Sequence, residues 1–274
     1  MDSVSGKKVL ITGAAMGMGK IYAQLAVNGG AAAVILWDVN QAELDKTAAE
    51  LKAQGGKVHP YTVDVSRMEA IQQTAEKVRQ EVGHPDIVFN NAGIVRGKFF
   101  WEHDPVKDIW LTMAINSLAP MYIAREFLPA MIASKTECRV INIASAAGTV
   151  SNPKMSVYCA SKWAALGWSD SVRLELEKTG NTHVRVTTVC PSYISTGMFE
   201  GARGPLMTPI LTPQYVCDKV WAAMKSGKPL LTLPWTVRLG MLCRGLLPLP
   251  IWDWVAEHIF GVYKSMDEFK GRGT

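Results

Sequence analysis

Short, nearly unbroken hydrophobic runs alternate along this chain with longer segments in which apolar residues recur every three or four positions. The short runs are rich in Val and Ile, as buried β-strands are, and the longer segments have the period of amphipathic helices. Strands are expected at residues 8–12, 32–37, 57–65, 86–90, 139–144, 184–190 and 229–233, and helices at 18–30, 41–56, 67–83, 104–133, 155–178 and 213–227.

Strands that are apolar along their whole length are buried on both faces, as they are when crossover helices cover a parallel sheet. The pattern therefore predicts an α/β protein with a doubly wound parallel sheet of about seven strands, helices on both faces and a helical C-terminal extension. We find no internal repeat, low-complexity tract or linker, so we expect residues 1–274 to form a single domain.

Composition narrows the class of protein. The net charge of +5 is spread along the chain, without the basic run typical of nucleic-acid binding. The five cysteines are odd in number and form no CxxC pair, which indicates neither a disulfide framework nor a zinc site and favours a reducing, cytoplasmic location. The N-terminal segment MDSVSGKKVLITG has no apolar stretch long enough for a signal peptide, so none is expected. A long uncharged run, residues 109–123, contains Asn116, Ser117 and Pro120, so no transmembrane helix is expected.

A glycine-rich segment, TGAAMGMG, follows the first expected strand and opens the first expected helix. Glycines let the backbone turn tightly and approach a pyrophosphate, and the N–H groups at a helix start favour negative charge. Gly13, Gly17 and Gly19 are spaced G-x-x-x-G-x-G, and a plain tight turn would also explain them. The segment is a candidate cofactor loop.

The second expected strand leads into Asp38, whose carboxylate is suited to accept hydrogen bonds from ribose hydroxyls. Asp38 is also a candidate N-cap for the helix that follows it. A carboxylate facing the ribose repels a 2′-phosphate, and no Arg or Lys lies between Gly13 and Gly19 or just after Asp38 to offset this repulsion. We therefore predict NAD(H) as the cofactor rather than NADP(H).

Tyr158 and Lys162 lie four residues apart in an expected helix, so their side chains share one face. They belong to a series of motifs that occur in order along the chain. The series resembles the short-chain dehydrogenase/reductase (SDR) family over residues 7 to about 196: TGAAMGMG (12–19), Asp64 in TVDVS, NNAG (90–93), Asn116 in MAINSLAP, Ser145 in INIASAAG, and YCASK (158–162).

The resemblance implies a Rossmann-type fold with a cofactor-binding and catalytic core at 7–196, followed by a substrate loop and hydrophobic C-terminal extension at 197–274. It implies a catalytic set of Asn116, Ser145, Tyr158 and Lys162, and no metal. The cofactor-binding residues that it implies are Gly13, Ala15, Gly17, Met18, Gly19, Asp38, Asp64, Val65, Asn91, Ala92, Gly93, Tyr158, Lys162, Pro191, Ile194 and Thr196.

These side chains suit proton transfer to or from an alcohol. A free tyrosine has a pKa of ~10, so we expect the positive charges of Lys162 and of the oxidised nicotinamide ring to lower the pKa of Tyr158. Ser145 would hydrogen-bond the substrate oxygen. The resemblance implies that Asn116 holds a water molecule that connects Lys162 to solvent. Ordinary alternatives are a turn-capping serine for Ser145 and a solvated helix residue for Asn116.

Ser192 departs from the family pattern, and Cys159 is a thiol beside a candidate catalytic residue. Ser192 in CPSYIST stands where the family has glycine, and a non-glycine residue restricts this turn if it requires a positive φ. Cys159, beside Tyr158, is either a reactive thiol or a small residue packed inside the helix, and we favour packing.

The sequence after Thr196 is rich in Met, Phe, Pro and Leu, and its layout weakly resembles the hydroxysteroid and retinol dehydrogenase branch. No convergent polar cluster appears there, which favours a lipophilic substrate. Trp and Arg residues in the extension are also compatible with a membrane surface. Because Asp253 and Glu257 interrupt that segment, we favour an active-site lid or a subunit contact over a peripheral membrane contact.

The sequence thus predicts an enzyme that transfers a hydride between NAD(H) and a bulky hydrophobic secondary alcohol or ketone, resembling a steroid, a retinoid or an aryl or alkyl alcohol. The alternatives are an NADPH-dependent carbonyl reductase and, less favoured, a protein that binds NAD(H) without catalysis. The resemblance implies a homo-oligomer, a tetramer or dimer formed through the helices at 104–133 and 155–178. We expect no nucleic-acid partner.

Overall fold

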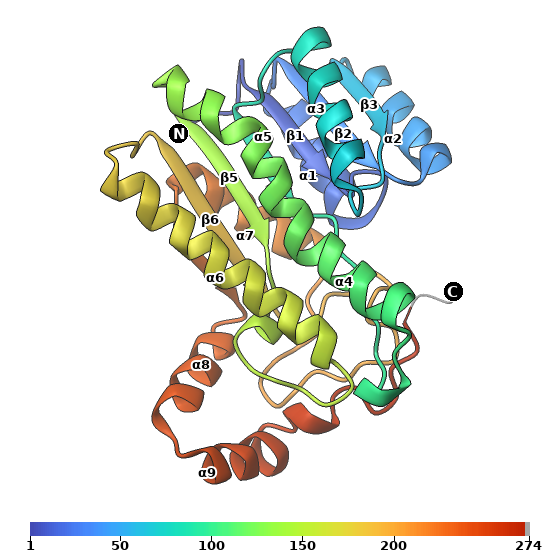
Figure 1. The fold of residues 1–274 in the computed structure, drawn as a ribbon, viewed down its shortest axis with the longest axis vertical. Helices are drawn as coiled ribbons and strands as arrows, with labels where there is room; N and C mark the ends of the chain where they lie inside the picture. Colours follow the sequence, from blue (N-terminus) through green and yellow to red (C-terminus); the bar gives the residue numbers. More distant parts are fainter. Residues whose placement is uncertain (272–274) are drawn as a thin grey trace.

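A computed structural model describes residues 1–271 and contains a parallel seven-stranded sheet of order β3-β2-β1-β4-β5-β6-β7 (Figure 1). The last three residues of the expected extension, 272–274, lie outside the described residues. The strands are β1 (Lys8–Thr12), β2 (Ala33–Asp38), β3 (Val58–Thr62), β4 (Ile87–Asn90), β5 (Cys138–Ile143), β6 (Val184–Pro191) and β7 (Leu230–Leu233).

The α-helices of residues 1–271 begin and end close to the positions that the hydrophobic period predicts, and two more follow β7. They are α1 (Gly17–Asn28), α2 (Gln41–Ala53), α3 (Met68–Glu81), α4 (Leu111–Met113), α5 (Ala119–Ser134), α6 (Ser156–Lys178), α7 (Pro213–Ser226), α8 (Thr236–Leu246) and α9 (Leu249–Trp254).

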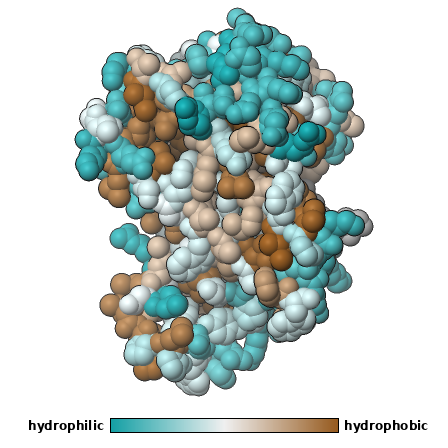
Figure 2. All heavy atoms as spheres, in the orientation of Figure 1, coloured by the Kyte–Doolittle hydropathy of each residue, from teal (hydrophilic) through white to brown (hydrophobic). Residues whose placement is uncertain are grey.

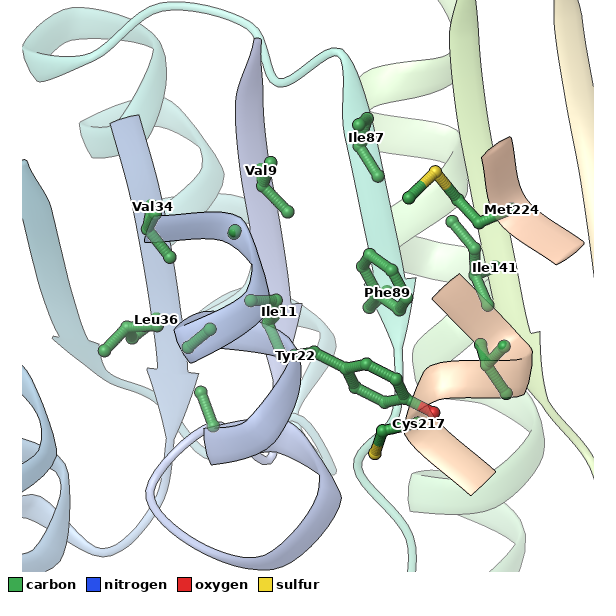
Figure 3. Close-up of a cluster of buried hydrophobic side chains, with 14 of the residues drawn as sticks. Val9, Ile11, Tyr22, Val34, Leu36, Ile87, Phe89, Ile141, Cys217 and Met224 are labelled. Carbon is green, nitrogen blue, oxygen red and sulfur yellow. The ribbon is translucent and has the colours of Figure 1, made fainter. Parts of the chain in front are cut away.

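Two hydrophobic layers cover the sheet, one on each face. Side chains of α1, α2 and α7 pack on one face, and those of α3, α5 and α6 pack on the other. Figure 3 shows the first layer, in which Tyr22 of α1 lies beside Cys217 of α7, close to Phe89 of β4. Because both faces are covered, most strand residues are apolar and buried, and polar strand residues such as Asn90, Asn142 and Thr188 are buried as well. The predicted doubly wound α/β fold is confirmed.

The helix expected at 104–133 is present but is not a uniform α-helix. Wide π-helical turns at Pro105–Trp110 and Ala114–Leu118 flank α4 and lead into α5. Pro120 has no N–H with which to bond the carbonyl group of Asn116, so the regular i to i−4 ladder cannot continue there. The N–H of Ala119 bonds to the carbonyl oxygen of Ala114 instead, one residue further back.

A buried network of hydrogen-bonded polar side chains holds α6 on the sheet. The Asn90 amide donates to the Asn142 side-chain oxygen over 2.8 Å, and the Asn142 amide donates to Ser169 Oγ over 2.8 Å. Ser169 in turn shares a 2.6 Å hydrogen bond with Thr188. Each partner is buried, so a shift of α6 along β4, β5 and β6 would leave these groups unpaired. This network fixes the position of α6, which carries Tyr158 and Lys162.

The C-terminal extension lies at one end of the molecule, beyond the layers that cover the sheet (Figure 1). It contains α8, α9 and the π-helical turn at Val255–Ile259. Figure 2 shows hydrophobic side chains on the surface of this end, and Trp235, Leu242 and Leu246 are among the exposed ones. None of the helices in residues 1–271 is long and apolar enough to cross a membrane.

Candidate active site

The order of the strands reverses beside β1, and the loops after β1 and β4 border a cleft there. Ligands of doubly wound sheets bind at this kind of position, outside the carboxyl ends of the strands. The loops are joined by hydrogen bonds: the Asn91 side-chain amide donates to the carbonyl oxygens of Thr12 (2.9 Å) and Gly13 (3.2 Å), and Thr12 Oγ1 accepts from the N–H of Ala92 (3.0 Å).

The glycines of the segment 12–19 have distinct structural roles. Gly13 has a φ of +64°, and a Cβ there would lie 3.0 Å from Ala92 Cα. A Cβ on Gly19 would overlap the carbonyl group of Gly13. Gly17 starts α1 with a φ of +57° and has open space where its Cβ would be. The loop therefore leaves space before a helix start that has no acidic residue in its first turn, and this fits a phosphate group.

Asp38 lies at the end of β2 and lines the cleft. Its carboxylate accepts hydrogen bonds from the N–H groups of Ala15 (2.9 Å) and Asn40 (3.0 Å). The alternative that Asp38 caps the next helix is wrong, because the Asn40 side chain caps α2 by accepting from the N–H of Glu43. Asp38 is therefore held at the cleft by its hydrogen bond to the glycine-rich loop.

The cleft has a volume of about 380 Å³ and brings together all the residues implied for cofactor binding except Ala15 and Gly19. Those two shape the loop behind it. The sequence reasoning missed Val39 and Ile94, which directly follow Asp38 and the NNAG segment, and their adjacency was an available signal. The other lining residues that it missed are Met16, Trp37, Asn40, Val63, Ile115, Ile143, Ala144, Ser192, Met198 and Phe199.

Ser145, Tyr158 and Lys162 also line this cleft. Ser145 follows β5, and Tyr158 and Lys162 lie one turn apart on α6. The Lys162 ammonium donates to the carbonyl oxygen of Ile143 over 2.8 Å and lies 5.7 Å from the centre of the Tyr158 ring. The structure therefore brings together the groups that the spacing of YCASK suggested.

The pKa values of these groups differ from the expectation. Burial raises the pKa of Tyr158 well above its usual value, and the hydrogen bond from Ser145 offsets only part of that rise. Burial lowers the pKa of Lys162 from 10.5 to about 8. The predicted lowering of the Tyr158 pKa by Lys162 is not seen, because desolvation of the phenolate is the larger effect. In the protein alone, Tyr158 is a neutral phenol that can donate a proton.

Asn116 is buried, so the alternative of a solvated helix residue is wrong. Its side chain donates to the carbonyl oxygen of Ile94 and accepts from the N–H of Ile94, both over 2.9 Å. It also donates to Ser161 Oγ over 3.0 Å. Asn116 does not line the cleft. It connects the π-helical turn to α6 and to the segment after β4.

Ser145 has the turn-capping bond that its ordinary alternative predicts, because its Oγ accepts from the N–H of Ala147 over 3.1 Å. The same residue lines the cleft, so both interpretations describe it. Ser192 does not have a positive φ, and its N–H donates to the Leu233 carbonyl oxygen, so serine fits this turn without strain. Cys159 is buried with a pKa raised to about 11 by desolvation, which favours packing over reactivity.

A second pocket, of about 110 Å³, adjoins the cleft at Ser145, Ser192 and Phe199, which line both. Its walls are mainly apolar and come from the segment after β5, the loop after β6, α8 and α9. The other residues that line it are Ala146, Ala147, Thr149, Val150, Asn152, Met155, Tyr193, Pro205, Leu206, Thr208, Thr236, Val237, Gly240, Trp252, Phe260 and Val262. In residues 1–271, we find no cluster of side chains suited to hold a metal ion.

A family model described as short chain dehydrogenase matches residues 7–205. Epidermal retinol dehydrogenase 2 of Mus musculus is 36% identical over 273 residues, which cover 98% of this chain and 87% of that protein. Estradiol 17-beta-dehydrogenase 11 of Mus musculus is 34% identical over 251 residues, which cover 90% and 81%. A short chain dehydrogenase/reductase from Burkholderia phymatum, solved in complex with NAD, is similar with a TM-score of 0.80 and 26% identity, covering 90% of this chain and 96% of that chain.

Proposed function

The chain belongs to the short-chain dehydrogenase/reductase family and is an oxidoreductase, and from this premise we propose that it interconverts a bulky hydrophobic secondary alcohol and its ketone with NAD(H). One observation carries the proposal: Ser145 lines both the cleft and the apolar pocket, and Tyr158 and Lys162 line the cleft beside it. The relatives named for retinol and estradiol support a hydrophobic substrate.

When bound in the cleft, NAD(H) supplies or accepts the hydride. The protein supplies the proton chemistry. Tyr158 donates its phenolic proton to a carbonyl oxygen during reduction and accepts the hydroxyl proton during oxidation. Ser145 holds the substrate oxygen by a hydrogen bond and stabilises the negative charge that develops on it. Lys162 places positive charge near the Tyr158 ring, which favours the phenolate that oxidation requires.

The preference for NAD(H) over NADP(H) rests on Asp38. Its carboxylate is fixed by Ala15 and Asn40 at the end of β2, so it cannot easily turn away from a 2′-phosphate. Repulsion between two charges ~4 Å apart corresponds to ~1–4 kcal/mol, or ~10- to ~1,000-fold in affinity. Solved structures similar to this chain include a complex with NAD and a complex with NADP, so the choice rests on Asp38 alone.

The experiment is an initial-rate assay of a graded series of secondary alcohols with NAD⁺ and with NADP⁺, and of the matching ketones with the reduced cofactors. We expect rates to rise with apolar bulk and to favour NAD(H). Tyr158→Phe should lower kcat by ~100- to ~10,000-fold, because it removes the proton donor and acceptor. NAD(H) affinity in Tyr158→Phe, measured by fluorescence titration, should change little.

Each part of the proposal has its own contrary result. Full activity of Tyr158→Phe would exclude Tyr158 as the acid and base. A preference for NADP⁺ would favour the NADPH-dependent carbonyl reductase. Tight NAD(H) binding without turnover of any alcohol or ketone in the series would favour the non-catalytic protein.

A further inference from the structure

Ser192 follows β6 at the boundary between the cleft and the apolar pocket, and it lines both, as Ser145 and Phe199 do. Its main chain is fixed, because its N–H donates to the carbonyl oxygen of Leu233 over 2.7 Å. Ser145 Oγ donates over 3.5 Å to the carbonyl oxygen of Pro191, the residue before Ser192. The turn that contains Ser192 is therefore adjacent to the side chain that would hold the substrate oxygen.

The hydroxyl group of Ser192 has no hydrogen-bond partner among residues 1–271, although its oxygen is shielded from solvent. Most buried polar groups are paired, because a buried hydroxyl group without a partner has lost its hydration and gained nothing in exchange. Its donor and its acceptor sites are both free for a ligand. Rotation about the Cα–Cβ bond moves the hydroxyl group among three staggered positions, so a ligand at this boundary can draw it into contact.

An unpaired hydroxyl group is not by itself the sign of a site. The hydroxyl groups of Thr112 and Thr187 are also buried without a partner in the described part of the chain. Neither of these residues lines the cleft or the apolar pocket. Ser192 differs from them in its location, because it lies where the two cavities meet, beside Ser145.

That boundary is where the reacting oxygen must lie in the proposed reaction, because the hydride comes from the cleft and the apolar body of the substrate occupies the pocket. During reduction the carbonyl oxygen gains negative charge as hydride adds to its carbon. Hydrogen-bond donors directed at such an oxygen stabilise the charge. An alkoxide oxygen has three lone pairs, so it can accept from Ser145, from Tyr158 and from a third donor.

We propose that Ser192 is a further catalytic residue, whose hydroxyl group donates a hydrogen bond to the reacting oxygen of the substrate alongside Ser145. The inference deepens the proposed function and rests on it for the reaction. The Ser192 proton stays on its own oxygen. Hydride passes between the cofactor and the substrate carbon, and Tyr158 transfers the proton to or from the reacting oxygen. The hydroxyl group of Ser192 becomes paired when the substrate binds.

The chain offers a matched control in the same strand that leads to Ser192. Thr187 lies in β6 and also has an unpaired hydroxyl group, but it lines neither cavity. The test compares Ser192→Ala with Thr187→Val. Each change removes a buried hydroxyl group that has no partner, which is neutral or stabilising for the folded protein. The midpoint of urea unfolding should therefore stay the same or rise in both variants, so loss of folding is not the expected result.

The first measurement is kcat for ketone reduction with NADH, together with NADH affinity by fluorescence titration. Ser192→Ala should lower kcat at least ~10-fold, because one donor to the developing charge is lost. Thr187→Val should keep the kcat of the wild type, and NADH affinity should be the same in all three proteins. Wild-type kcat in Ser192→Ala, an equal loss in Thr187→Val, or a loss of NADH affinity in place of kcat would overturn the inference.

The second measurement does not depend on turnover. Acetophenone, an aromatic ketone, is titrated by calorimetry into the protein saturated with NAD⁺, which cannot reduce it. Ser192→Ala should weaken its binding by ~2- to ~10-fold, the effect of one neutral hydrogen bond, and Thr187→Val should not. Unchanged acetophenone affinity in Ser192→Ala would overturn the inference. A wild-type protein whose acetophenone binding depends on Ser192, but which reduces no ketone, would contradict the proposed function and leave the contact of Ser192 with the carbonyl oxygen supported.

Discussion

Lys162 is a cation that the fold holds almost entirely out of water. Its side chain is on α6 and is 4% exposed, with the Ile143 carbonyl oxygen as its hydrogen-bond acceptor. Burial penalises the charged form, which is why its pKa falls to about 8. Burying this charge costs stability, and the proposed role of Lys162 beside Tyr158 would account for keeping it there.

This arrangement makes the stability of the protein depend on pH in a defined direction. Between pH 8 and 10.5 the unfolded chain keeps the Lys162 proton and the folded protein loses it, so stability rises with pH. The shift from 10.5 to about 8 corresponds to about 3 kcal/mol across that window. We expect the free energy of unfolding of the wild type to increase by up to that amount relative to Lys162→Met, as measured by urea unfolding from pH 7 to 10.

Lys178→Met is a suitable control, because Lys178 is an exposed lysine at the end of the same helix. Its unfolding free energy should follow that of the wild type at every pH. If the wild-type and Lys162→Met curves stay parallel between pH 8 and 10, burial does not penalise the charged form of Lys162.

At the scale of elements, the turn between β1 and α1 depends on contacts that leave no room for side chains. Gly19→Ala would force its new Cβ against the Gly13 carbonyl group, so the loop would have to change shape. We expect NAD(H) affinity to fall at least ~10-fold, equivalent to ~1.4 kcal/mol, because the loop would no longer fit the phosphates. Fluorescence titration of NADH measures this loss directly.

The control for that change is Gly245→Ala, which adds the same methyl group to a helical glycine with open space around it. NADH affinity should remain that of the wild type. An unaltered affinity in Gly19→Ala would show that the loop adjusts without losing its fit, which would contradict the role given to Gly19.

The strands and most helices were predictable because their patterns depend on burial alone. Strand β2 is buried through Ala33–Trp37, and its sequence is correspondingly apolar throughout. The π-helical turns around Asn116 were not predictable, because they follow from Pro120 together with the bonds between Asn116 and Ile94, a residue distant in sequence. A local hydrophobic period contains no information about such contacts.

Some residues of the candidate site could likewise be predicted from the sequence, and others could not. Residues in short motifs, such as Asp38 and Tyr158, could be placed from the sequence, because each motif joins a strand end or helix face to a required chemistry. The residues that form the walls of the apolar pocket could not be predicted from the sequence. Gly240, Trp252 and Val262 come from the extension, and only the packing of α8 and α9 brings them opposite the segment that follows Ser145. The raised pKa of Tyr158 likewise depends on tertiary burial.

At the scale of the whole molecule, α6 presents two large apolar side chains that nothing in residues 1–271 covers. Trp163 and Leu174 are 45% and 51% exposed and lie eleven residues apart, which places them on one face of the helix. Leu118, at the end of the π-helical turn before α5, is also exposed. These residues lie on the helices through which the family resemblance implies subunit contacts, so we propose that this face forms a homo-oligomer.

Trp163→Glu should shift the protein toward smaller species, because a carboxylate buried without a partner opposes association. Size-exclusion chromatography with light scattering, over a range of protein concentrations, measures the change. Trp101→Glu is the control, since Trp101 is 80% exposed but lies outside these helices. A wild-type protein that is monomeric at all concentrations, or an equal effect of the two substitutions, would contradict the proposal.

The two binding regions of this molecule come from different stretches of the chain. Apart from Met198 and Phe199, the cleft that fits the cofactor is built from residues before position 197, whereas one wall of the apolar pocket comes from residues 236–262. Sequence changes in the extension can therefore alter which substrate is accepted while the cofactor region stays intact. Grafting the extension of a relative onto this core would accordingly change the pocket wall and leave the cleft, with Ser145 and Tyr158, unaltered.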